Sequence, residues 1–191
     1  MTYRKDVFVK QVDMSDHFAR HLIHYRAIKS NPTLHWTRSW FWTDTCDAHL
    51  LQATICWCMI FGSRGQNEIH LQRLAVDQAD ELQQSFKSNL LSALRISESE
   101  WEAYWTEMLA FRNKYAAHRE LGFKQPVPIF DRALEAAFCY DQWVREVIHP
   151  DMFDSPPLEQ LVGEWQRSVG LEVSAAMNAS TAEPPAHGAG R

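Results

Sequence analysis

The chain has 191 residues, of which 46% are hydrophobic and 23% charged, and its 19 Lys and Arg against 24 Asp and Glu give a formal charge of −5. With 8 Trp, 10 Phe and 5 Tyr it has enough large apolar side chains for one soluble domain, which argues against intrinsic disorder and against a disulfide scaffold. The acidic balance also argues against a nonspecific nucleic-acid coat, because neutralising phosphates requires clustered Lys and Arg, but it allows a local basic site.

The beginning of the chain, MTYRKDVFVKQVDMSD, lacks the apolar segment and the small-residue cleavage site of a signal peptide. We therefore expect a cytoplasmic protein. The longest apolar stretch, residues 50–61, is shorter than the ~20 residues that a membrane span needs, so it predicts a buried helix and no membrane partner. The four cysteines are expected to be reduced core residues, because a free Cys behaves as a small hydrophobic side chain.

Glycine and proline are few and lie between long periodic stretches, which predicts an all-α protein, an antiparallel bundle of about six helices. The expected helices are 13–30, 34–61, 68–95 with a break near 76–77, 97–121, 131–148 and 158–173. Residues 1–12 are expected to form an N-terminal arm. Residues 174–191 are small, polar and proline-containing, so they are expected to form a disordered tail beyond a bundle of residues 13–173.

The fourth expected helix starts with a capping box, Ser97-Glu98-Ser99-Glu100. At 100° per residue, an apolar stripe runs along this helix through Trp101, Tyr104, Trp105, Met108, Leu109 and Tyr115. Arg112 falls inside the stripe, where a guanidinium is costly unless an acceptor meets it. Two interpretations stay open: an ion pair with a core acid such as Asp44 or Asp47, or an anion site at a cleft or interface.

The segment Arg112-Asn113-Lys114-Tyr115-Ala116-Ala117-His118 resembles the signature of HEPN domains, in which an Arg and a polar residue precede a His. Over residues 13–150, with a long aromatic second helix, the chain resembles bacterial HEPN proteins of abortive-infection and toxin systems. The resemblance implies a HEPN-like helical bundle, and many such domains are metal-independent ribonucleases. It also implies a homodimer, an RNA substrate and a possible cognate antitoxin.

The resemblance assigns catalysis to Arg112, Asn113 and His118, with neither a metal nor a cofactor. The chemistry suits these residue types, because a His with a pKa near 6.5 exchanges protons at neutral pH and an Arg holds a phosphate through two hydrogen bonds. On an ideal α-helix, however, Arg112 and His118 are about 120° apart and roughly 9 Å apart along the axis. One helix does not easily aim both at one phosphate, whereas two copies at a two-fold interface can.

Basic residues are locally in excess around this motif. Between 112 and 124 the chain has Arg112, Lys114, Arg119 and Lys124 against a single acid, Glu120. This excess predicts contacts with a short RNA segment. The alternative is a solvated helix end, at which cations are favourable.

Tyr115 allows a second comparison with HEPN toxins. In the subtype whose Tyr is modified by adenylylation, that Tyr lies two residues after the His. Here Tyr115 precedes His118 and Glu120 takes the later position, which argues against that subtype. We expect Tyr115 to belong to the core or an interface, or to support Arg112 from a second layer together with Asp44 and Asp47.

One face of the first expected helix carries Asp13, His17, His21 and His24. These side chains are potential ligands for a transition metal. No H-E-x-x-H pattern accompanies them, so a polar, partly exposed stripe is the alternative. His35, His49, His70 and His149 are expected to be isolated structural or surface residues.

The resemblance, together with these patterns, implies a cytoplasmic HEPN-type endoribonuclease that acts as a toxin or phage-defence effector. A noncatalytic HEPN-like module that binds nucleotides or a protein is the first alternative, because a fold does not guarantee an activity. A helical metalloprotein that uses the first-helix histidines is the second.

Overall fold

The computed structural model describes residues 3–35, 40–117, 121, 126–148 and 155–181. Within them lie six α-helices: α1 Lys5–Lys29, α2 Trp40–Phe61, α3 Ala79–Leu94, α4 Glu98–Phe111, α5 Phe130–Ile148 and α6 Leu158–Thr181. Three short helical segments connect them: η1 Pro32–His35, η2 Leu71–Arg73 and η3 Arg112–Ala117. No strand occurs among these residues apart from an isolated bridge between Tyr3 and Ala75, so the all-α prediction is confirmed.

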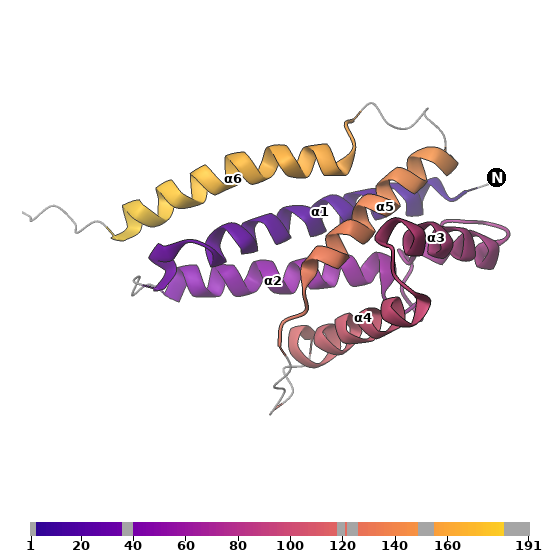
Figure 1. The fold of residues 1–191 in the computed structure, drawn as a ribbon, viewed down its shortest axis with the longest axis horizontal. Helices are drawn as coiled ribbons and strands as arrows, with labels where there is room; N and C mark the ends of the chain where they lie inside the picture. The colour runs from indigo at the N-terminus through magenta and orange to yellow at the C-terminus, as the bar shows by residue number, and fades with distance from the viewer. Residues whose placement is uncertain (1–2, 36–39, 118–120, 122–125, 149–154, 182–191) are drawn as a thin grey trace, which may run out of the picture.

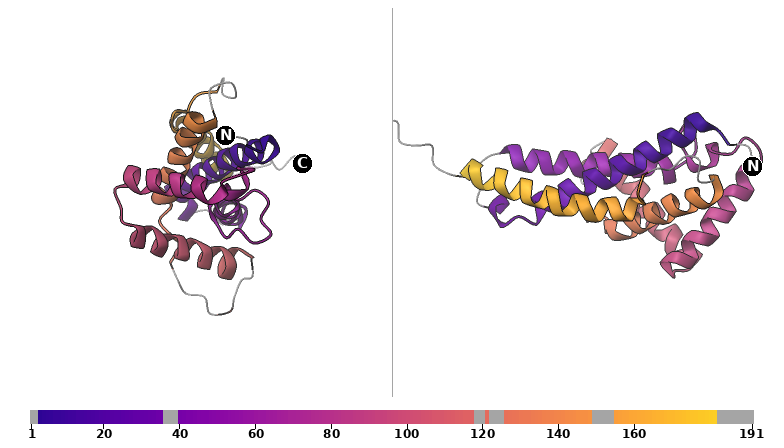
Figure 2. Two further views of the ribbon diagram at one scale, coloured as in Figure 1. Left: turned by 90° about the vertical axis from the view of Figure 1, so that its right-hand side faces the viewer. Right: turned by 90° about the horizontal axis from the view of Figure 1, so that it is seen from above.

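Helices α1, α2 and α6 run along the long axis of the molecule, and α3, α4 and α5 gather over one half of it (Figures 1 and 2). Helix α1 packs chiefly against α2, and α6 packs along α1. Helix α4 lies on the side of the α1–α2 pair that faces away from α6 (Figure 1). None of the helices in the described ranges is both long and apolar enough to cross a membrane.

Two apolar clusters form the core. The larger centres on aromatic rings from α2, α3 and α5, where Phe61, Phe86 and Tyr140 meet with centroids about 6 Å apart and Trp57 adjoins Phe61. Trp57 is fully buried, as expected for a central α2, and burying each such side chain stabilises the fold by ~2–3 kcal/mol. The smaller cluster lies between α1, α2 and the end of α6, and consists of Ile28, Cys46, Val173 and Met177. All four cysteines are buried and free.

The expected N-terminal arm is instead the first part of α1. This helix begins at Lys5 rather than at residue 13, and Val7 and Phe8 are buried in the core. The helical spacing of these two residues continues toward Phe18 through Gln11 and Ser15, which are buried too. Because these two buried positions are polar, the sequence pattern made this segment look like surface.

The predicted start of the disordered tail, at residue 174, is too early. Helix α6 continues to Thr181, because Val173 and Met177 bury their side chains against Ile28 and Cys46. The small residues between them fit a helix, which the composition of the segment concealed. Residues 182–191 of the predicted tail lie outside the described residues.

Most other boundaries follow the sequence signals. Ser97 caps α4 as predicted, since its backbone N–H donates to Glu100 Oε2 (2.7 Å) and its Oγ accepts from the Glu100 N–H (3.3 Å). The expected helix 68–95 is divided into η2 and α3, with Gln78 in the left-handed region at the break. Of the expected helix 34–61, the structure gives η1 at its start and α2 from Trp40, and residues 36–39 lie outside the described residues.

Candidate anion-binding site around Arg112

The segment that starts at Arg112 begins where α4 changes its hydrogen-bonding pattern. Instead of continuing as an α-helix toward residue 121, the chain forms a π-helix, η3, over Arg112–Ala117. The spacing of 100° per residue assumed for the motif therefore does not apply beyond Phe111. Segments of π-helix are rare and occur frequently at functional sites.

The Arg112 side chain is half-buried against α2 and lies beside Cys58. It borders a pocket of about 250 Å³ whose other lining residues are Ile55, Cys58, Met59, Ser63 and Asn67. Its Nε is buried without a hydrogen-bond partner among the described residues, and no ion pair joins Arg112 to a carboxylate among them. A guanidinium in this state retains its capacity to bind an anion.

Cys58 does not neutralise this charge. Its side chain is buried, and burial raises the pKa of the thiol to about 12, although the adjacent Arg112 lowers it in part. At physiological pH the sulfur is therefore a neutral thiol. The guanidinium charge remains available to a ligand in the pocket.

The two aspartates proposed as partners of Arg112 are not brought to it. Asp44 is exposed and Asp47 half-buried in the first half of α2. From Asp47 to Cys58, where Arg112 lies, the helix rises about 16 Å. The interpretation of Arg112 as one member of a core ion pair with these acids therefore lacks a contact.

The neighbours of Arg112 in the motif lie at different depths. Asn113 and Lys114 are exposed. Tyr115 is half-buried, stacks on Phe111 at a ring distance of 5.0 Å and packs against the larger core cluster. His118, Arg119 and Lys124 lie outside the described residues. The structure thus positions two of the three proposed catalytic side chains and one of the three additional RNA-binding residues.

The opposite wall of the pocket comes from the loop 62–73, which the sequence analysis did not identify. The loop leaves α2 at Gly62, where a Cβ would clash with the Cys58 carbonyl oxygen. Asn67 donates from Nδ2 to the Met59 carbonyl at 2.8 Å. Its Oδ1 accepts from the Ile69 N–H at 3.1 Å, so this side chain fixes the loop beside α2.

His70 anchors the same loop from within. Its Nε2 donates to the Gly62 carbonyl (3.0 Å) and its Nδ1 accepts from the Gln72 N–H (3.2 Å), an arrangement that needs the neutral ring. Burial lowers the pKa of His70, which favours the same form. His70 is a buried residue that shapes the wall of the pocket.

The histidine face of α1 is in contact with α2. His21 Nδ1 lies 2.8 Å from His49 Nδ1, and the ring of His24 stacks on His49 at 4.7 Å. His49 is therefore in contact with two other histidines, and the prediction that it is isolated is wrong. His17 lies 3.6 Å from Asp13 at the exposed edge. Within the described ranges, no three His, Cys, Asp or Glu side chains are arranged to hold a metal.

We expect the stability of the protein to fall below pH 6.5 because of this cluster. Burial lowers the pKa of His49 from 6.5 to about 4, and it lowers the pKa of His21 as well. The unfolded chain therefore binds protons that the folded chain excludes, and the loss grows as the pH falls from 6.5 toward 4. At pH 5.0 it should reach about 1 kcal/mol, after allowance for solvent screening of half-exposed rings.

Urea unfolding at pH 7.5 and 5.0 measures this loss. His49→Gln should remove most of the difference between the two pH values, whereas His17→Gln at the exposed edge should retain it. An unchanged difference in the His49 variant would contradict the assignment.

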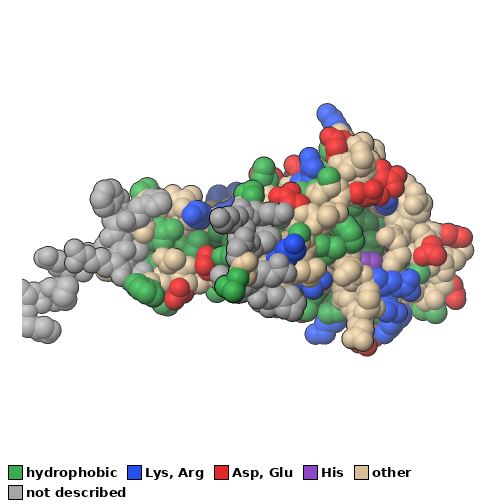
Figure 3. All heavy atoms as spheres, turned by 90° about the horizontal axis from the view of Figure 1, so that it is seen from below, with side chains coloured by type: hydrophobic (Ala, Val, Ile, Leu, Met, Phe, Trp, Pro, Cys, Tyr) green, Lys and Arg blue, Asp and Glu red, His purple; other side chains and the backbone are tan. Residues whose placement is uncertain are grey.

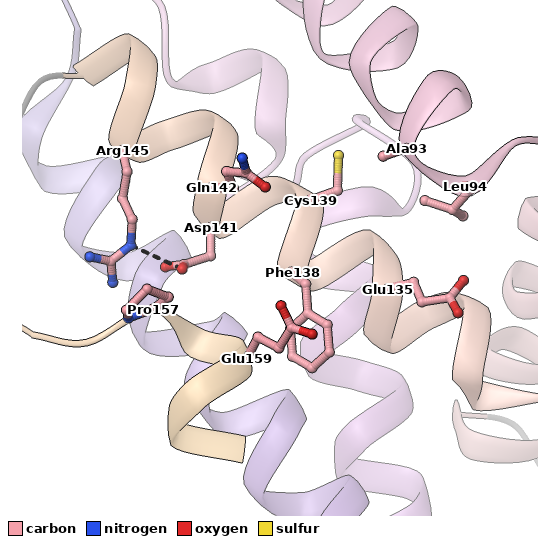
Figure 4. A pocket seen from close by; sticks show the side chains of 10 residues that line it. All are labelled: Ala93, Leu94, Glu135, Phe138, Cys139, Asp141, Gln142, Arg145, Pro157 and Glu159. Carbon is pink, nitrogen blue, oxygen red and sulfur yellow. Dashed lines mark hydrogen bonds and ion pairs between the residues drawn. The ribbon is translucent and has the colours of Figure 1, made fainter. Parts of the chain in front are cut away.

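A larger pocket, of about 460 Å³, lies between α5, the end of α3 and the start of α6 (Figure 4). Its charged pair is structural, since Arg145 Nε donates to Asp141 Oδ2 at 2.9 Å. Arg145 also donates to the Ser155 and Pro156 carbonyls, and Asp141 accepts from the Leu158 N–H at the start of α6. These bonds attach α6 to α5, so the pocket offers no uncommitted cation like Arg112.

Comparisons with known proteins found no match to this chain among protein-family models, curated proteins or solved structures.

Proposed function

We propose that the protein is a metal-independent endoribonuclease of HEPN type that works as a homodimer. The observation that carries this proposal is Arg112, a half-buried guanidinium at a pocket with no carboxylate partner among the described residues. In the sequence it stands next to Asn113 and six residues before His118. A fixed cation close to a titratable imidazole is the minimum that RNA cleavage without metal requires.

In the proposed reaction Arg112 binds the scissile phosphate and stabilises the charge of the pentacoordinate phosphorane. One His118 accepts the proton of the 2′-hydroxyl as its oxygen attacks phosphorus. His118 of the partner subunit donates a proton to the 5′-oxygen as the P–O5′ bond breaks. Asn113 orients the phosphate. The products are a 2′,3′-cyclic phosphate and a 5′-hydroxyl, so protons and charge balance without an external reactant.

The homodimer supplies what one copy lacks. A two-fold axis near η3 would bring two copies of Arg112 and His118 to one cleft and provide a separate base and acid. Lys114, Arg119 and Lys124 would hold the flanking RNA. We propose that the protein acts on cytoplasmic RNA as a toxin or phage-defence effector, and that a cognate antitoxin protein covers Arg112 in the inactive state.

Cleavage of an end-labelled single-stranded RNA tests the proposal. We expect cleavage to persist in excess EDTA and to leave a cyclic phosphate, because no step uses a metal. A substrate with a single 2′-deoxy nucleotide at the cleavage site should stay intact there, since it lacks the attacking oxygen. Cleavage that requires added Mg²⁺, or that proceeds at the deoxy position, would contradict the mechanism.

A noncatalytic nucleotide-binding module is the second candidate, and it is supported by the same Arg112, which has no carboxylate partner in the part of the chain that the structure describes. Retained binding of RNA or nucleotides, lost in Arg112→Met, together with intact RNA after long incubation, would favour this candidate over the ribonuclease.

A further inference from the structure

We propose that the loop 62–73 is a second phosphate-binding wall of the site, in which Arg64 and Arg73 hold the RNA phosphates next to the one bound by Arg112. This inference rests on the proposed function, which it extends from one phosphate to a single-stranded segment. The loop and Arg112 border one pocket, since Ser63 and Asn67 line it from the loop side.

Arg73 shows the same unsatisfied state as Arg112. Four buried side-chain N or O atoms lack a hydrogen-bond partner in the described part of the chain: Ser15 Oγ, Trp57 Nε1, Arg73 Nε and Arg112 Nε. Two of these four are thus guanidinium nitrogens, one of Arg112 at the pocket and one of Arg73 in the loop that contributes Ser63 and Asn67 to the pocket. Arg73 donates to the Gly65 carbonyl at 3.2 Å, so a bond to the neutral backbone holds it, and among the described residues no carboxylate pairs with it.

Arg64 adds a second charge to the loop. Arg64 is exposed. The pKa of His70 is lowered mainly by burial and further by the positive charges of Arg64 and Arg73, so both arginines lie near this imidazole. Glu68 is the one acidic residue in the sequence from 62 to 73, and no ion pair among the described residues joins it to either arginine. The underside of the molecule shows Lys and Arg side chains at several places, with Asp and Glu side chains near some of them (Figure 3).

The loop is held in place before any ligand binds. Gln11 of α1 donates from Nε2 to the carbonyls of Ile69 and His70 at 2.9 and 3.0 Å. Asn67 attaches the loop to Met59 of α2, and His70 bonds back to Gly62, the first residue of the loop. A loop with so many anchors loses little conformational entropy on binding, so its backbone and the anchored Arg73 are preorganised for adjacent phosphates.

RNA binding by the double variant Arg64→Gln/Arg73→Gln tests this wall. The probe is a fluorescent 12-nucleotide single strand with 2′-O-methyl groups, which cannot be cleaved, so anisotropy reports binding alone. We expect about a tenfold rise in Kd at 0.1 M salt. The slope of log K against log salt should become shallower by about 0.7 for each lost phosphate contact.

Arg167→Gln on α6 is the matched control, because it removes the same charge from an exposed position elsewhere. Arg64→Gln alone, at an exposed loop position, keeps the test valid if the double variant does not fold. A Kd and a salt slope equal to those of Arg167→Gln would overturn the inference, while RNA cleavage by the parent would leave the proposed function standing. Weakened binding in the loop variants of a parent that never cleaves RNA would support the wall and overturn the ribonuclease.

Discussion

Replacing Arg112 by Met is expected to abolish RNA cleavage and to leave the protein at least as stable as its parent. Loss of one preorganised donor to a developing negative charge costs about 10²- to 10³-fold in rate. The free energy of unfolding should not fall, because Arg112 has no carboxylate among the described residues that would be left unpaired. Met fits the apolar walls formed by Ile55 and Met59, and replacing a poorly paired charge in this way is often neutral or stabilising.

Cleavage rates and thermal unfolding of Arg112→Met and of Arg167→Met, its exposed counterpart on α6, measure both effects. A structural Arg112 predicts the opposite pair of results. A variant that melts several degrees below the parent yet cleaves RNA at the parent rate would show that Arg112 supports the fold and not the reaction.

The variant His118→Ala tests the second proposed catalytic side chain. Loss of the general acid–base group should lower the rate by about 10²- to 10⁴-fold. Mixing this variant with Arg112→Met gives a heterodimer that holds one Arg112 and one of the two His118 side chains, so it should recover only the part of the rate that does not need the second His118. No restoration, with a monomer in light scattering at micromolar concentration, would contradict the composite site.

Replacing Gln11 by Met should cause the largest loss of stability. Gln11 is fully buried, donates to the Ile69 and His70 carbonyls and accepts from the Tyr140 hydroxyl at 2.6 Å. A thioether of similar length leaves all three groups without this partner, and each buried unsatisfied group costs about 1–3 kcal/mol. We expect the free energy of unfolding to fall by about 3 kcal/mol or more.

Urea unfolding measures this loss, and Gln160→Met at an exposed position of α6 should stay within about 0.5 kcal/mol of the parent. Because Gln11 also anchors the loop 62–73, its variant should bind RNA more weakly at temperatures where it remains folded. A variant as stable as Gln160→Met would contradict the role of Gln11.

The helices could be predicted wherever local signals mark them. The capping box at Ser97 gave the start of α4, and proline on either side of α5 gave its limits within one residue. The start of α1 could not be predicted, since Gln11 is buried only because loop carbonyls and Tyr140 meet it, and those partners lie 58 to 129 residues away. Local patterns carry no information about such contacts.

The site could be predicted only where local sequence signals mark its residues. Helical periodicity predicted that Arg112 lies among apolar residues. Its contact with Cys58 and the apolar residues that line its pocket agree with this prediction. The change to a π-helix has no local pattern that distinguishes it from an α-helix, and the loop 62–73 joins Arg112 only through tertiary packing. His49 meets His21 across two helices, 28 residues apart, so its position could not be predicted either.

The two apolar clusters differ in size, so the two ends of the molecule differ in local stability. The larger cluster lies beneath Arg112 and the loop 62–73, whereas the smaller holds the end of α6 with four buried residues and shares Tyr25 and Val169 with the larger. Opening the smaller end exposes little apolar surface, so it costs much less free energy than global unfolding. We therefore expect the end of α6 to open locally more often than the helices around Arg112.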